Sequence, residues 1–308
     1  MPQPSGITLA NEALSLRLLP ERGAKLVSLR DRRLDREWLL PSQLPGNGYP
    51  ASVYGADFSL GDTSGFDECL PNVAAGPSPD GSYHWPDHGE LWSRPWEVRT
   101  EEETLVCTVR GIGYPYTLTR RLRLQGDALH INYALQNQGT QPFPHLWSAH
   151  PLLQVSPGMR ILLPDGVDEV FVNGASHSEL GTFGELRSWP RLGGTFDFSQ
   201  VQPKETGVAV KLFVPGLTEG HCTLWEPVTG HALRFDWDPT EIPYLGLWLC
   251  YGGWPTDGRS GHLTIAIEPC TGMPDPLHEA WAQGCAASVK PGATLHWSLR
   301  LRSFLLQE

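Results

Sequence analysis

The sequence predicts an all-β protein, and three observations support that prediction. Short segments alternate apolar and polar residues with a period of two, the pattern of half-buried antiparallel strands; they begin at Leu14, Leu105, Leu129, Val208, Leu263 and Leu295. The 28 prolines and 33 glycines are spread along the chain and divide it into short segments. Helical signals are few. We therefore expect a large antiparallel β-sandwich with few short helices.

No linker or internal repeat divides the 308 residues, and β-sandwiches of this length commonly form one domain. We expect a single domain over residues 1–308. The best helical signal is Asp275-Pro276 followed by LHEAWAQ and Gly284, with Asp275 as N-cap and the glycine as C-terminal cap. The segment from Pro41 to Gly81 reads as a long irregular loop, and such loops are often functional.

Composition disfavours several classes of function. A net charge of −11 argues against binding to nucleic acid or to an anionic membrane surface, because both need clustered Lys and Arg. No run of 18 apolar residues and no signal peptide are apparent. The six cysteines are scattered without CxxC pairs, which indicates reduced thiols rather than a zinc site. These features together predict a cytoplasmic location.

The segment HLTIAIEPC offers a candidate general base. Ile265 and Ile267 share one face of the expected strand, so Glu268 lies on the other face with Ala266. A carboxylate at the end of an apolar strand is costly to bury, and burial would raise its pKa toward neutrality. That suits a base working near pH 7. A solvated glutamate at a sheet edge is the alternative.

The segment PFPHLWSAHPLLQV contains two histidines. His145 and His150 are an odd number of positions apart, so in an extended strand only one of them enters a given cleft. His150 directly precedes Pro151, where a strand ends or kinks, and it can project from a rim. A structural histidine bonded to the backbone is the competing interpretation.

Twelve tryptophans is a high count, and several lie beside titratable residues, such as Trp92 near His88 and Trp248 upstream of Glu268. Aromatic rings stack on the C–H faces of sugars, although they also commonly fill cores. His84 and His88 are four apart, but the Pro and Gly around them argue against a helix and hence against a metal site. No dinucleotide or phosphate fingerprint is present.

Three segments in order, HGELWSRPW, NQGTQPFPHLWSAHPLLQV and IAIEPCTGMPD, resemble the aldose 1-epimerase (galactose mutarotase-like) family, from about Ile7 to the end of the chain. The resemblance implies the galactose mutarotase-like supersandwich. It also implies catalytic roles for His150 and Glu268 and a sugar-binding role for His88. The LGLWLCYG segment resembles the stretch in which a Trp borders the pocket, which implies Trp248.

The chain departs from the family pattern at its polar sugar contacts. The family's sugar-binding arginine and aspartate have no clear match; the strand nearest to the expected aspartate carries Lys211. We expect Asp67 and Glu68 of the GFDECLPN segment to supply replacement contacts, with Arg94 as a further candidate for substrate binding.

The resemblance implies an isomerase that interconverts the α and β anomers of a free aldose, with Glu268 as base, His150 as acid and no metal or organic cofactor. The expected partner is a small sugar, and the chain is expected to be a monomer or homodimer. Three alternatives stay open. They are a non-catalytic carbohydrate-binding or sensor protein, a sugar-phosphate epimerase, and a glycoside hydrolase or lyase that pairs Glu268 with Asp67 or Glu68.

Overall fold

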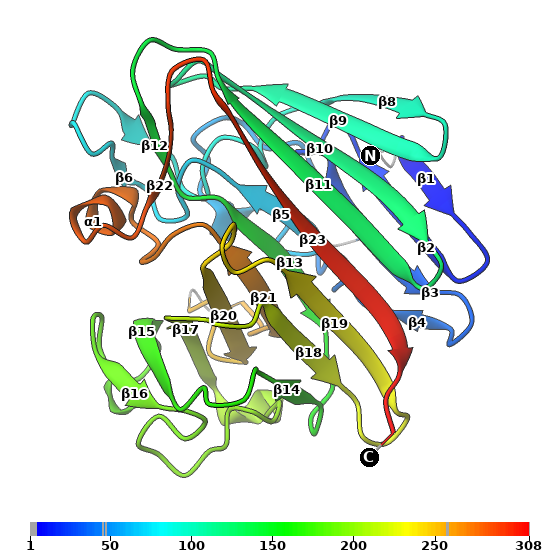
Figure 1. Ribbon diagram of the computed structural model, residues 1–308. Coiled ribbons are helices and arrows are strands. Elements are labelled where there is room, and N and C mark those ends of the chain that lie inside the picture. The colour runs from blue at the N-terminus through cyan, green and yellow to red at the C-terminus, as the bar shows by residue number, and fades with distance from the viewer. Residues whose placement is uncertain (1–4, 45, 47, 257–258, 308) are drawn as a thin grey trace.

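A computed structural model describes residues 5–44, 46, 48–256 and 259–307, and most of these residues lie in two large antiparallel sheets (Figure 1). The first sheet has 11 strands in the order β1-β2-β3-β5-β13-β21-β20-β17-β15-β16, with β4 paired to β3. Its strands are β1 (Ile7–Ala10), β2 (Leu14–Leu19), β3 (Lys25–Asp31), β4 (Arg36–Glu37), β5 (Phe66–Cys69), β13 (Ser148–Gln154), β15 (Glu169–Ala175), β16 (Leu186–Ser188), β17 (Val208–Val214), β20 (Tyr244–Tyr251) and β21 (Leu263–Cys270).

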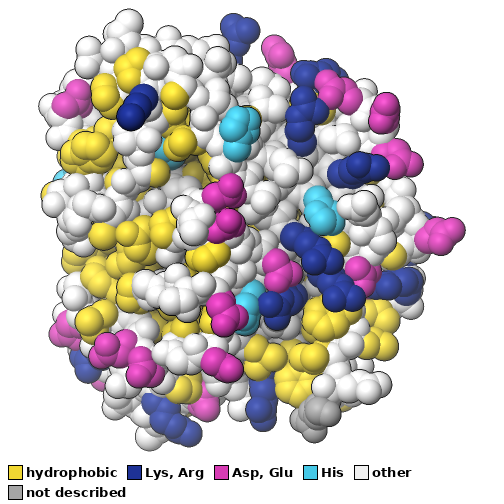
Figure 2. Space-filling view, viewed as in Figure 1, with side chains coloured by type: hydrophobic (Ala, Val, Ile, Leu, Met, Phe, Trp, Pro, Cys, Tyr) yellow, Lys and Arg dark blue, Asp and Glu magenta, His cyan; other side chains and the backbone are white. Residues whose placement is uncertain are grey.

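The second sheet has eight strands in the order β14-β18-β19-β23-β11-β10-β9-β8. On the face shown in Figure 2, Lys and Arg side chains lie among Asp and Glu side chains. Buried and more exposed residues alternate along the longer strands of this sheet, which directs polar groups outward and apolar groups inward. The strands are β8 (Glu97–Glu101), β9 (Thr104–Arg110), β10 (Tyr116–Gln125), β11 (Ala128–Asn137), β14 (Arg160–Leu162), β18 (His221–Trp225), β19 (His231–Trp237) and β23 (Thr294–Leu305).

Short elements complete the described part of the chain. Two small two-stranded sheets pair β6 (Gly76–Pro77) with β7 (His84–Trp85) and β12 (Phe143–His145) with β22 (Ala287–Val289). The α-helix is α1 (Leu277–Ala282), and 3-10 turns cover Phe58–Leu60, Ser178–Leu180 and Lys204–Thr206. None of the described helices is long and apolar enough to cross a membrane.

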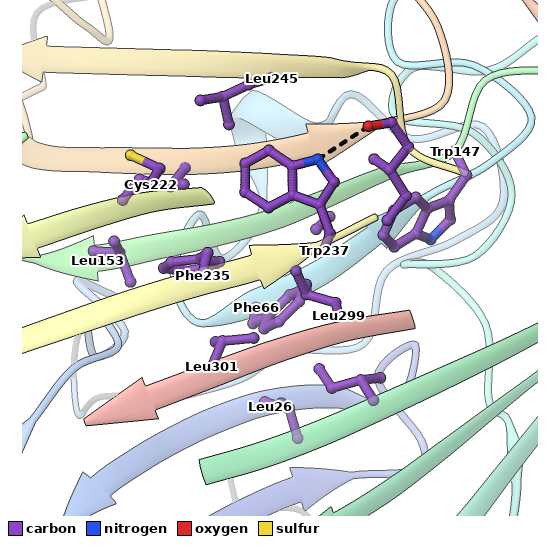
Figure 3. Packing of buried hydrophobic residues seen from close by; sticks show 14 of the residues in the cluster. Leu26, Phe66, Trp147, Leu153, Cys222, Phe235, Trp237, Leu245, Leu299 and Leu301 are labelled. Atoms are coloured by element: carbon purple, nitrogen blue, oxygen red, sulfur yellow. Dashed lines mark hydrogen bonds between the residues drawn. The ribbon is translucent and has the colours of Figure 1, made fainter. Parts of the chain in front are cut away.

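The main core fills the space between the two large sheets (Figure 3). Phe66 and Leu153 of the 11-stranded sheet pack in one cluster with Phe235, Leu299 and Leu301 of the eight-stranded sheet, and all five are at most 2% exposed. Burying each such side chain contributes about 1.5–3 kcal/mol to folding. The opposite face of the 11-stranded sheet is left free to carry a site.

The predicted all-β sandwich is confirmed, and each alternating segment forms a strand: β2, β9, β11, β17, β21 and β23. The predicted helix exists, but it begins one residue later than expected. Pro276 occupies the N-cap position, and the Asp275 side chain instead accepts a hydrogen bond from Asn173 (2.8 Å). Gly284 follows the helix with φ +70°, and all six cysteines are free thiols.

The expectation of an irregular loop from Pro41 to Gly81 is wrong in its centre. Strand β5 lies there, between β3 and β13 in the middle of the large sheet. All four of its residues, Phe66-Asp67-Glu68-Cys69, are buried. The two adjacent carboxylates make this strand hard to recognise from the sequence. A buried acidic pair is uncommon, and it depends on cations that distant segments of the chain supply.

Candidate functional site

The candidate site begins with two cross-strand neighbours at the centre of the 11-stranded sheet. Strands β13 and β21 are antiparallel with Ser148 opposite Cys270, a register that places His150 opposite Glu268. On the other side of β13, His150 pairs with Asp67 of β5. Directly opposed residues of an antiparallel pair have Cβ atoms about 4.5–5.5 Å apart. The sheet therefore holds an imidazole and a carboxylate side by side on the face that points away from the core.

A cavity of about 310 Å³ covers this face of the sheet. It receives the alternate side chains of β13, β20 and β21, whose intervening residues enter the core. His88, His150, Trp248 and Glu268 all line it, as the sequence led us to expect of a binding site. The other lining residues are Phe58, Ser59, Thr63, Val73, Ala74, Asp87, Leu152, Lys211, Trp254, His262, Thr264 and Asp275.

Glu268 is completely buried among the protein atoms but poorly supplied with hydrogen-bond donors. Its Oε2 forms an ion pair with Lys211 Nζ and lies 3.4 Å from Ser148 Oγ. Among the described residues, Oε1 has no hydrogen-bond partner. Burial raises the pKa of this carboxyl, and the Lys211 ammonium opposes the rise without cancelling it. The arrangement leaves one oxygen able to accept a proton.

Lys211 reaches Glu268 across an intervening strand. It lies on β17, and β20 separates β17 from β21. Gly246 of β20 pairs with Glu268 and leaves the gap through which the lysine passes. A Cβ added at Gly246 would lie 3.2 Å from both Lys211 Nζ and Glu268 Cβ. The ammonium also lies 3.9 Å from Asp275 Oδ1.

His150 is 7% exposed, and burial lowers the pKa of its imidazole well below 6.5, assisted by the nearby His88, Lys211 and Lys25. Neither ring nitrogen has a hydrogen-bond partner among the residues that the structure describes. The ring of His88 meets that of His150 edge to face at a centroid distance of 5.1 Å. His150 is therefore a neutral imidazole with free hydrogen-bonding capacity at neutral pH.

His88 is fixed by its neighbours and by an uncommon backbone. Its Nδ1 lies 2.9 Å from Asp87 Oδ1, and Phe58 stacks on the ring at 4.0 Å. Its φ of +56° is rare for a residue other than glycine, and such conformations gather at functional sites. The following Gly89 lies so close to Leu70 that a Cβ would meet its carbonyl oxygen at 2.2 Å. The glycine after His88 is thus required by the local backbone.

One wall of the cavity is apolar. Trp248 packs on a small buried cluster formed by Leu40, Leu152 and Ala266, and Trp254 approaches it edge to face at 6.1 Å. A flat aromatic face beside hydrogen-bonding groups matches the mixed surface of a sugar ring. Leu152 forms part of this wall.

Asp67, Glu68 and Arg94, which we expected to contact substrate, do not line this cavity. Asp67 is buried against Lys25, 3.0 Å away, and Glu68 points into the core. Arg94 donates to the backbone carbonyl of Arg110. The hydrolase alternative that paired Glu268 with Asp67 or Glu68 therefore lacks its second carboxylate.

The site also contains residues that the sequence interpretation did not assign: Lys211, Asp275, Asp87 and Phe58. Lys211 had a detectable signal, since it is the one charged residue in the otherwise apolar strand VAVKLFV. Asp275 lies seven residues beyond Glu268 and appeared only as an expected helix cap. Asp87 and Phe58 gave no such signal, because their proximity to His88 depends on loop packing.

Comparisons with known proteins agree with this fold. The family model for aldose 1-epimerase matches residues 5–172, and no curated protein matches the chain. The Slr1438 protein of Synechocystis sp. PCC 6803 is 17% identical with a TM-score of 0.74, over 99% of this chain and 97% of that one. An aldose epimerase homologue from C. elegans is 17% identical with a TM-score of 0.68, over 98% and 99% of the two chains. A galactose mutarotase-like protein from Lactobacillus casei is 18% identical with a TM-score of 0.66, over 97% and 100%.

Proposed function

Since the chain belongs to the aldose 1-epimerase family, we propose that it interconverts the α and β anomers of a free aldose by acid–base opening and closure of the sugar ring. The observation that supports this most directly is the pair formed by His150 and Glu268, opposed on neighbouring strands at the wall of one cavity. Anomer exchange needs one proton acceptor and one proton donor at a hemiacetal, and these two groups can supply them.

In ring opening, Glu268 takes the proton of the anomeric hydroxyl while His150 delivers a proton to the ring oxygen. The bond between the anomeric carbon and the ring oxygen breaks, and the anomeric oxygen becomes an aldehyde oxygen. Rotation about the adjacent carbon–carbon bond exposes the other face of the aldehyde. The two protons return by the reverse transfers when the ring closes, so the reaction gains and loses no protons overall.

The environments of the two groups set the pH dependence. The reaction starts from ionised Glu268 and protonated His150, but burial raises the pKa of the first group and lowers that of the second. The two shifts therefore reduce the fraction of the free enzyme that is in the productive combination. We expect a bell-shaped profile of kcat/KM, whose two limbs belong to the coupled pair.

Exchange NMR on a panel of free aldoses tests the proposal with wild type and Glu268→Gln. We expect faster α/β exchange for at least one sugar, and a loss of about 100-fold or more in the variant, which keeps the fold but has no proton acceptor. Line broadening that shows binding without faster exchange would replace the epimerase with a carbohydrate-binding or sensor protein. Wild-type rates in Glu268→Gln would remove Glu268 from the mechanism.

A further inference from the structure

Buried lysines are rare in this chain, and one of them opens onto the cavity. The sequence has four lysines, of which Lys25 and Lys211 are buried. Lys25 is enclosed by Asp62 and Asp67 and does not line the cavity. Lys211 lines it and forms an ion pair with the carboxylate assigned as the base. Burying an ammonium is costly unless a carboxylate pairs with it, and Glu268 is the carboxylate that pairs with Lys211.

We infer that Lys211 is a positioning residue for Glu268: its ammonium keeps the buried carboxylate ionised and, by holding Oε2, leaves Oε1 for the anomeric hydroxyl. This inference rests on the proposed function for its catalytic meaning, but the contact itself does not. The geometry is specific, because Lys211 reaches Glu268 only over Gly246.

The charges around Glu268 show why the cation matters. Lys211 faces it from β17, His150 from β13, and Asp275 from the segment after β21, where that carboxylate opposes ionisation. His88 adds a weaker favourable influence, and the thiol of Cys69 lies nearby on β5. Burial and Asp275 both favour the neutral acid, and His150 is itself neutral. Lys211 is therefore the main group that holds the proton off Glu268.

Lys211→Met removes the charge and retains most of the volume. The direct measurement is a ¹³C titration of the Glu268 carboxyl in protein labelled at glutamate, with the resonance assigned by its absence in Glu268→Gln. We expect the pKa of Glu268 to rise in Lys211→Met, and the acid limb of kcat/KM to move to higher pH with it. At a fixed pH well below that limb, kcat/KM should fall by about tenfold for each unit of upward shift, and by less nearer to the limb. Lys290→Met, which removes an exposed lysine, should move neither.

Gly246→Ala tests the same contact without removing the lysine. The added Cβ presses on both partners, so a smaller rise in the Glu268 pKa is expected. This variant keeps the test decisive if Lys211→Met does not fold. An unchanged Glu268 titration in the folded variant would overturn the inference. If the wild type accelerates exchange of no sugar, the proposed function fails, while the titration still shows whether Lys211 controls the ionisation of Glu268.

Discussion

Glu68 and Glu268 are both 0% exposed, yet their carboxylates differ in how many hydrogen bonds they accept. Glu68 accepts hydrogen bonds from Arg120 Nη1 (2.9 Å), Tyr133 Oη (2.8 Å) and Trp147 Nε1 (2.7 Å), so both of its oxygens are satisfied. Glu268 has one ion pair and one free oxygen. Burial raises the pKa of both groups, so the pKa does not separate them. The number of satisfied oxygens separates the structural carboxylate from the one free to exchange a proton.

The largest expected difference between the two is in stability. Glu68→Gln leaves the Arg120 guanidinium buried without its carboxylate, and breaking such a pair costs about 3–5 kcal/mol of unfolding free energy. Glu268→Gln should cost much less, because Asp275 remains 3.9 Å from the Lys211 ammonium and a poorly satisfied charge is removed. Urea unfolding followed by tryptophan fluorescence measures both. Equal losses in the two variants would make Glu268 a structural residue.

A second test uses Asp67, which lies next to Glu68 in the chain but on the opposite face of β5. Burial outweighs the paired Lys25 and raises the pKa of Asp67 from 3.8 to about 6. The native state therefore binds an extra proton between about pH 4 and 6, so this group's contribution to stability is lost as pH rises through that window. Asp67→Asn should remove this pH-dependent loss of unfolding free energy, which is on the order of 2–3 kcal/mol. Urea unfolding at several pH values checks this.

The matched control for Asp67→Asn is Asp35→Asn, at a side chain that is 85% exposed. Its removal should leave the pH dependence of the unfolding free energy unchanged. If Asp67→Asn also leaves the dependence unchanged, the Lys25 pair holds Asp67 fully ionised down to its ordinary pKa, and burial does not outweigh that pair.

A third, smaller effect on stability concerns one hydrogen-bond donor of Glu68, the carboxylate whose two oxygens both accept hydrogen bonds. Tyr133→Phe deletes the hydroxyl that donates to Glu68 but keeps the ring that stacks on Trp297 at 5.3 Å. A hydrogen bond to a charged group contributes about 1.5–3 kcal/mol. Tyr114→Phe removes a hydroxyl that donates to a backbone carbonyl at the surface, and it should cost less than half as much. Similar losses of unfolding free energy in Tyr133→Phe and Tyr114→Phe would show that Glu68 does not depend on each of its hydrogen-bond donors.

These two carboxylates also show how far the sequence could lead. The alternation around Ile265 and Ile267 placed Glu268 on the non-core face, and the family resemblance directed attention to His150 and His88; all three line the cavity. Nothing in the sequence showed that Glu68 is a fully hydrogen-bonded structural carboxylate, because its donors lie 52, 65 and 79 residues away along the chain. Strand β5 was missed for the same reason. Local periodicity reports burial, whereas the partners of a buried charge are fixed only by the fold.

The smallest expected effect concerns the second contact of Glu268. Ser148 Oγ lies 3.4 Å from Oε2, longer than an ordinary hydrogen bond, and it also lies 3.1 Å from the carbonyl oxygen of Ala149. Ser148→Ala should therefore change the unfolding free energy by less than about 0.5 kcal/mol and leave the Glu268 titration close to that of wild type. The measurement is the same ¹³C titration used for Lys211→Met. A shift of the Glu268 pKa as large as that in Lys211→Met would mean that both Lys211 and Ser148 bind this carboxylate. Glu268 would then resemble the fully hydrogen-bonded Glu68, and its assignment as the proton acceptor would be weaker.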